Sequence, residues 1–261
     1  MIIATKMSNS QPLAASSKLL EQVTDIQIKK NKDEFSLYRL RREAESLVKR
    51  AGQPSDYVVL GAIQTLLNYP NKVRDTFNQA ISLFPTEHQL YVNYSVSLSN
   101  LGLMSDAITY AVRAYEMCPG DLFIVNHLIG CYIGNGQLAA AKKWCGKWHQ
   151  EKPQEPHKFS RVIEGAIKIL ETSHVSEDAV TSLFQMAYSV LHDNNIYYIP
   201  DRELYIQQDD ESVWIAFRID VLRPVDEVVD LSVALAERFA ETDLGKLLAN
   251  KLVIGYESGL E

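Results

Sequence analysis

The sequence predicts a mainly α-helical protein that ends in a small α/β domain, and three observations lead to this fold class. Pro85, Pro119 and Pro153 recur every 34 residues. Each of these prolines follows a helical pattern of apolar residues, and such a fixed period is typical of stacked helical pairs that form a solenoid. After residue 195 the pattern changes to a period of two, in which Val213, Ile215 and Phe217 alternate with Trp214, Ala216 and Arg218, as in a β-strand.

Three consecutive units, 54–87, 88–121 and 122–155, share one layout of aromatic, small and apolar residues. These are Tyr57, Leu60, Gly61, Phe77 and Ala80 in the first unit, Tyr91, Tyr94, Leu98, Ala107, Ala111 and Ala114 in the second, and Leu128, Tyr132, Ala141, Cys145 and Trp148 in the third. Asn68, Gly102 and Gly136 are expected to end the first helix of each pair in a left-handed conformation. The pattern resembles the tetratricopeptide repeat. This resemblance implies antiparallel helical pairs that bind other proteins.

Helical segments are also expected on both sides of these units. Residues 1–15 show no clear periodicity and are expected to be a disordered arm. Residues 16–53 predict two helices that form an N-terminal cap, because the end of a solenoid must present a polar face to water. Residues 156–195 predict a further, C-terminal helical pair.

Residues 196–261 predict a small acidic α/β domain with the element order β-β-α-β and an antiparallel sheet. The strands are expected at 196–199 and 204–206, at 213–221 and at 252–256. The helix begins at Pro224, and its expected core face is Val225, Val228, Val229, Leu235, Ala236 and Phe239. This segment contains 14 acidic and 6 basic side chains. Its negative charge would repel a phosphate backbone, so we expect no nucleic-acid partner.

Composition limits the class of protein. The chain has 261 residues, of which 46% are hydrophobic, and a net charge of −7. No apolar run reaches the roughly 18 residues of a membrane span, and the first residues lack a secretory apolar segment. Three cysteines suit a reducing compartment better than a disulfide framework. We therefore expect a cytoplasmic protein with no membrane partner.

The helical pairs predict a protein-binding groove. If Tyr91, Tyr94 and Leu98 face the core, other residues of the same helix and their equivalents in the neighbouring units lie on the opposite side. The expected partner-binding residues are Val58, Ala62 and Thr65 in the first unit, Gln89, Val92, Asn93, Val96 and Asn100 in the second, and Phe123, Asn126 and Ile133 in the third. Amides among apolar residues suit an extended peptide or an amphipathic helix, because they can bond its backbone.

Two clusters could carry chemistry, and we expect neither to do so. His127 and Cys131, with Cys145 and His149, have types and spacings that could bind zinc. We expect no metal there, because His127 should point away from the core that holds the cysteines. His192, Asp193, Asp201, Arg202 and Glu203 lie near the predicted junction with the α/β domain. No catalytic motif accompanies them, so we expect no catalytic residues and no cofactor.

The sequence therefore favours an adaptor or a chaperone-like protein that binds another protein in the groove of its helical repeats. One alternative is an inhibitor or immunity-type protein whose acidic C-terminal domain blocks a basic enzyme. A further alternative is an enzyme with its site in the C-terminal domain.

Overall fold

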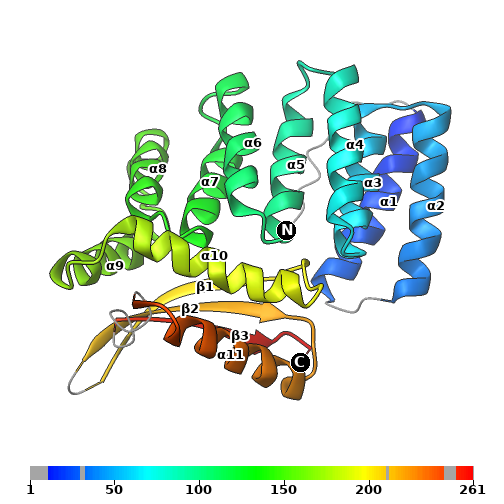
Figure 1. Ribbon diagram of the computed structural model, residues 1–261. Coiled ribbons are helices and arrows are strands. Elements are labelled where there is room, and N and C mark those ends of the chain that lie inside the picture. The colour runs from blue at the N-terminus through cyan, green and yellow to red at the C-terminus, as the bar shows by residue number, and fades with distance from the viewer. Residues whose placement is uncertain (1–10, 30–32, 210–211, 244–250, 261) are drawn as a thin grey trace. The chain divides into compact units, whose positions relative to one another are not determined.

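The computed structural model describes residues 11–29, 33–209, 212–243 and 251–260, and it is mainly helical with a small C-terminal sheet (Figure 1). The chain forms two compact units, Met1–Cys118 and Pro119–Glu261, called here unit 1 and unit 2. Unit 1 contains α1 (Gln11–Ile28), α2 (Glu34–Arg50), α3 (Pro54–Leu66), α4 (Pro70–Leu83), α5 (His88–Asn100) and α6 (Met104–Met117).

Unit 2 contains the remaining helices and the sheet. Its elements are α7 (Leu122–Gly134), α8 (Leu138–Glu151), α9 (Ser160–Thr172), α10 (Glu177–Asp193), β1 (Arg202–Gln208), β2 (Val213–Val221), α11 (Val225–Ala240) and β3 (Leu252–Ser258). No helix within the described ranges combines the length and the apolar character that crossing a membrane requires.

The turns inside the helical pairs are where the sequence places them. Asn68, Gly102 and Gly136 follow α3, α5 and α7, and their φ angles are 65°, 71° and 74°. In each turn the N–H of the next residue donates to a carbonyl five residues back, as Leu103 does to Leu98 at 2.9 Å. This hydrogen bond satisfies a helix-end carbonyl, which explains why glycine or asparagine stands there. The expected turn positions are confirmed.

The second helix of each pair ends before its proline, as the sequence predicts. The residues that directly precede Pro85, Pro119 and Pro153 have φ and ψ angles of −132° and 63°, −136° and 72°, and −132° and 74°. A proline ring clashes with a preceding residue in the helical conformation. The three prolines thus terminate α4, α6 and α8 at equivalent points.

The N-terminal helices differ from the expected cap. The helix α1 begins at Gln11, so the expected disordered arm does not extend to residue 15, and residues 1–10 lie outside the described part of the chain. The helix α1 packs mainly against α3 and less against α2. The hydroxyl of Ser16 on α1 donates to the carboxylate of Asp56 on α3, which fixes this contact.

The core of unit 1 is built around α3, whose residues 56–66 are all buried. Gly61 is required on this helix because a Cβ atom there would overlap the ring of Phe77 from α4. Phe77 in turn stacks on Tyr94 of α5, with ring centroids 4.9 Å apart. The small and aromatic landmarks of the sequence therefore fit together as one packed layer.

Unit 2 contains a three-stranded mixed sheet, so the expectation of an antiparallel sheet is wrong. The strands lie in the order β1-β2-β3; β1 pairs antiparallel with β2, whereas β3 pairs parallel with β2. The helix α11 carries the chain back between β2 and β3, and such a crossover produces parallel neighbours. The expected strand at 196–199 is also wrong, because these residues belong to no strand.

The helix α10 connects the other helices of unit 2 with its sheet. Its Tyr188 hydroxyl donates to the carbonyl of Gly134 at 2.8 Å, and burial raises the pKa of this tyrosine to about 12. The helix α10 runs along the sheet (Figure 1), and its Phe184 packs on Phe217 of β2 with ring centroids 4.4 Å apart. The predicted third repeat, the C-terminal pair and the α/β segment thus belong to one unit.

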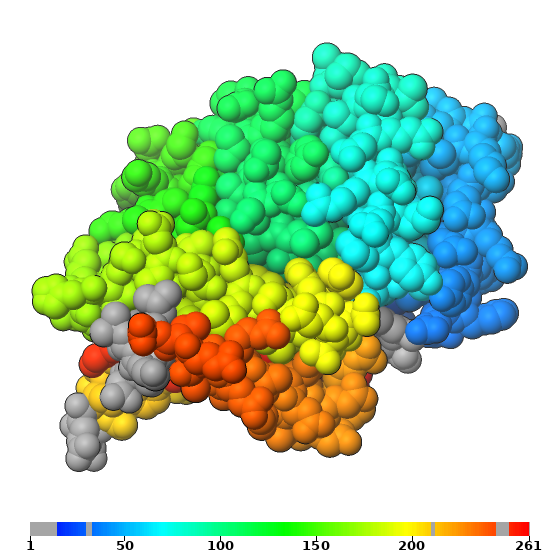
Figure 2. All heavy atoms as spheres, viewed as in Figure 1, coloured from blue at the N-terminus to red at the C-terminus, as the bar shows by residue number. Residues whose placement is uncertain are grey.

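The helix α11 lies beside α10 on the surface of unit 2, with its orange spheres against the yellow ones in Figure 2. Its buried residues are Val228, Leu231 and Leu235. Val225 and Val229, which the sequence assigned to the core face, are 62% and 54% exposed. Apolar residues occur on both sides of this helix, so hydrophobicity alone does not identify the buried side.

Candidate protein-binding surface

The three expected partner-binding residues of α3 are not accessible. Val58, Ala62 and Thr65 are only 6%, 2% and 0% exposed. The reason is that α3 packs against α1, α2, α4 and α5, so no side of the helix is left open. The assignment of these residues to an open groove is therefore wrong.

On α5, the apolar and the polar residues of the expected surface behave differently. Val92 and Val96 are 4% and 5% exposed, so they belong to the core, and their assignment to a groove is wrong. Gln89, Asn93 and Asn100 are half-buried and remain accessible. The accessible part of this surface is therefore polar.

The amides of α5 keep hydrogen-bonding capacity. Asn93 Nδ2 donates to the carbonyl oxygen of Gln89 at 2.8 Å. Among the described residues, no hydrogen bond involves Asn93 Oδ1 or the side chain of Asn100. Seven positions separate the two asparagines, so they lie on the same side of the helix. The pair could bond a backbone that approaches from solvent.

On α7, in unit 2, the three expected residues have separate roles. Ile133 is 5% exposed and is a core residue, which excludes it from an open groove. The ring of the half-buried Phe123 lies parallel to that of His127, with centroids 6.3 Å apart. Asn126 is exposed, but its Oδ1 accepts a hydrogen bond from Nε2 of His157 at 2.9 Å. Asn126 thus holds the segment between α8 and α9, a contact that the sequence analysis missed.

His157 has a well-defined protonation state in this position. Its side chain is buried, and its Nδ1 accepts the N–H of Phe159 at 3.3 Å. Nε2 therefore carries the proton that bonds Asn126, and the ring is the neutral tautomer. Burial, with a smaller contribution from Lys158, lowers the pKa of His157. The rings of Trp148 and His157 form a T-shaped pair, with centroids 4.9 Å apart.

The possible metal ligands lie on α7 and α8. His127 Nε2 and Cys131 Sγ are 3.4 Å apart on α7. Cys145 is buried on α8, where burial raises the pKa of its thiol, and His149 is exposed. Within the part of the chain that the structure describes, no three His, Cys, Asp or Glu side chains converge as metal ligands.

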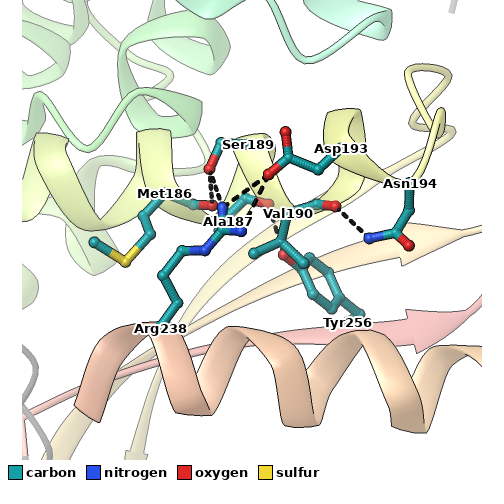
Figure 3. Close-up of polar contacts among 8 residues, drawn as sticks. All are labelled: Met186, Ala187, Ser189, Val190, Asp193, Asn194, Arg238 and Tyr256. Atoms are coloured by element: carbon teal, nitrogen blue, oxygen red, sulfur yellow. Dashed lines mark hydrogen bonds and ion pairs between the residues drawn. The ribbon is translucent and has the colours of Figure 1, made fainter. Parts of the chain in front are cut away.

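The possible catalytic residues at the junction enter different contacts. Asp193 accepts two hydrogen bonds at 3.1 Å from the guanidinium of Arg238 on α11, which also donates to Ser189 (Figure 3). His192 stacks on Tyr197. Asp201 accepts the backbone N–H of Arg202, and Glu203 pairs with Arg218. The Asp193–Arg238 contact joins α10 to α11. The hydroxyl of Tyr256 on β3 donates to the carbonyl of Ala187, which joins α10 to the sheet (Figure 3).

The sequence matches no protein-family model and no curated protein.

Proposed function

We propose that this protein is an adaptor or a chaperone-like protein that binds a peptide or a helix of another protein through tetratricopeptide-like helical pairs. The observation that carries this proposal is the recurrence of one backbone geometry every 34 residues. A left-handed residue closes the first helix of each pair at Asn68, Gly102 and Gly136, and a non-helical residue before proline ends the second. Repeated helical pairs of this kind present extended binding surfaces.

The binding surface proposed within unit 1 is the accessible side of α5. Asn93 and Asn100 offer amide groups with unused hydrogen-bonding capacity, and Gln89 extends the same polar surface. An amide can donate to a carbonyl and accept from an N–H, so it recognises the backbone of an extended segment. The surface is smaller and more polar than the eleven-residue groove expected from the sequence.

The test begins with the full chain purified from its native cells and with identification of the protein that accompanies it. The affinity of that partner is then measured for Asn93→Ala/Asn100→Ala. Each lost hydrogen bond contributes about 0.5–1.5 kcal/mol, so the double variant should bind roughly 5-fold to over 100-fold more weakly. Both asparagines are half-buried and accessible to solvent. Surface substitutions usually change stability by at most about 0.5 kcal/mol, so the melting temperature should hardly change.

A matched control is Asn78→Ala/Gln79→Ala, which removes two exposed amides from α4 of the same unit. This variant should bind the partner with wild-type affinity. If the α5 variant keeps full affinity, or if the control variant loses as much affinity for the partner as the α5 variant does, the proposed surface is wrong.

One observation favours the alternative of an inhibitor that blocks a basic protein. On one face of the sheet, Arg218 pairs with Glu203 at 3.1 Å, with Asp220 at 3.2 Å and with Glu257 at 2.9 Å. Three carboxylates around one guanidinium leave an excess of two negative charges. The strand register places exposed Val253 on the same face. Glu203→Gln/Glu257→Gln would weaken binding to a basic partner and leave binding through α5 unchanged.

A further inference from the structure

A cavity of about 500 Å³ lies in unit 1 between α2 and the turn that joins α3 to α4. Arg41 and Glu45 of α2 form one wall, and Gln64 of α3 forms another. Tyr69 and the first turn of α4, including Lys72, complete it. Cavities of about 300–1,000 Å³ hold small organic molecules in other proteins. None of the expected partner-binding residues lines this cavity.

Gln64, a largely buried residue, supplies a hydrogen-bond donor. The residue is 5% exposed, and its Oε1 accepts the hydroxyl of Thr76 at 2.8 Å. Thr76 thereby fixes the orientation of the amide, whereas no hydrogen bond within the described residues involves Nε2. Nε2 is not fully enclosed by protein atoms, so an acceptor inside the cavity can reach it and accept its hydrogen bond.

The first turn of α4 adds further donors. The helix begins with Pro70, has no side-chain hydrogen bond at its N-cap and has no acidic residue in its first turn. The N–H groups at a helix start lack partners within the helix, and the helix dipole places partial positive charge there. Asn71 and Lys72 of this turn line the cavity.

The charged residues of the cavity favour an anion. The guanidinium of Arg41 is 3.4 Å from the carboxylate of Glu45 and 5.3 Å from the ring centroid of Tyr38. The guanidinium atom nearest to Glu45 is the buried Nε, which forms this ion pair without a hydrogen bond. Arg41 and Lys72 against Glu45 leave one net positive charge at the walls. The rings of Tyr69 and Pro70 provide apolar surface beside these donors.

We infer that this cavity binds a small organic molecule through an oxyanion group. The oxyanion accepts hydrogen bonds from Gln64 Nε2, from the N–H groups that start α4 and from the Lys72 ammonium, while its organic part lies on Tyr69 and Pro70. Charge-assisted hydrogen bonds of this kind are stronger than neutral ones. A helix start is a favourable place for such an anion.

The experiment uses the full chain and three probes of similar size: phenyl phosphate, benzoate and neutral benzyl alcohol. Binding is followed by calorimetry and by the amide NMR signals of Asn71 and Lys72. At least one anion should bind with a dissociation constant below about 10 mM and should shift both signals, whereas benzyl alcohol should do neither. The anion that binds more tightly identifies the oxyanion as phosphate or carboxylate.

Lys72→Gln tests the role of the charge, because Lys72 is exposed and its substitution should not affect folding. This variant should bind the anion about tenfold more weakly or worse. Lys49→Gln removes an exposed charge from α2 that does not line the cavity, and this variant should bind like the wild type. Failure of both anions to bind, equal binding of benzyl alcohol, or equal effects of the two variants would overturn the inference.

Discussion

Phe77 shows how a single side chain organises unit 1. Its ring is 0% exposed, stacks on Tyr94 and occupies the space left by Gly61. Removing it would create a cavity between three helices, because the neighbouring backbones cannot collapse fully around the missing ring.

Phe77→Ala should therefore lower the free energy of unfolding by roughly 3–5 kcal/mol. Chemical denaturation followed by circular dichroism measures this loss. Phe35→Ala is the control, since Phe35 is 80% exposed on α2 and its removal should cost no more than about 0.5 kcal/mol. A loss below about 1 kcal/mol for Phe77→Ala would contradict the packing described here.

His157 predicts a dependence of stability on pH. Its pKa is lowered in the folded protein, whereas an unfolded histidine titrates near about 6.5. The unfolded state thus binds the proton first as the pH falls. The stabilisation from neutral His157 is complete above the unfolded-state pKa of about 6.5 and is lost progressively as the pH falls below it.

The measurement compares the melting temperatures of wild-type protein and His157→Gln between about pH 7.5 and pH 5.5. As the pH falls over this interval, the melting temperature of the wild type should decrease more than that of the variant, because the variant has no titrating ring at this position. If the melting temperatures of the two proteins changed equally with pH, His157 would not be held in its neutral form.

The helix α7 provides a test of the turn that ends it. Gly136 has a φ of 74°, and a Cβ atom there would lie 3.1 Å from Val180 Cγ1 and 3.2 Å from Phe184 Cδ2 of α10. Gly136→Ala should cost at least about 1–2 kcal/mol, because a left-handed alanine is strained and these neighbours would have to move. Thermal and chemical unfolding measure the change.

Gly130→Ala is the matched control on the same helix. A Cβ atom at Gly130 would meet nothing within 4 Å, and the position lies inside the helix. Alanine should stabilise this position by about 0.5–1 kcal/mol. If both variants had the same effect on stability, the special role of the Gly136 turn would be wrong.

Structural features that depend only on residues adjacent in the sequence could be predicted. The turns at Asn68, Gly102 and Gly136 and the helix ends before the three prolines follow from local backbone sterics. The direction of β3 could not be predicted in this way, because it depends on how α11 returns to the sheet. Alternation of apolar residues indicates a strand but not its partner.

The expected binding residues show the same limit. Helical periodicity predicted correctly that Tyr91, Tyr94 and Leu98 are buried, but it could not show that α1 packs on α3. Asn126 was expected to be available, yet it bonds His157, which lies 31 positions further along the chain. No spacing rule connects such residues. Burial by distant segments decides which part of a helical face remains a surface.

Charge distinguishes the two units of the molecule. Unit 1 contains 13 basic and 11 acidic side chains, whereas unit 2 contains 13 basic and 22 acidic ones. A basic partner would therefore be attracted to unit 2, and the carboxylates around Arg218 lie there. The proposed surface on α5 relies on neutral amides. The two hypotheses thus predict different responses to salt.

Partner affinity measured at about 50 mM and about 300 mM sodium chloride separates these hypotheses, because the Debye length falls from about 14 Å to about 6 Å. Binding through the amides of α5 should weaken by no more than about threefold, since hydrogen bonds between neutral groups are little screened. Binding through the carboxylates of the sheet should weaken by about tenfold or more. A tenfold loss that disappears in Glu203→Gln/Glu257→Gln would place the partner on the sheet and would contradict the proposed surface on α5.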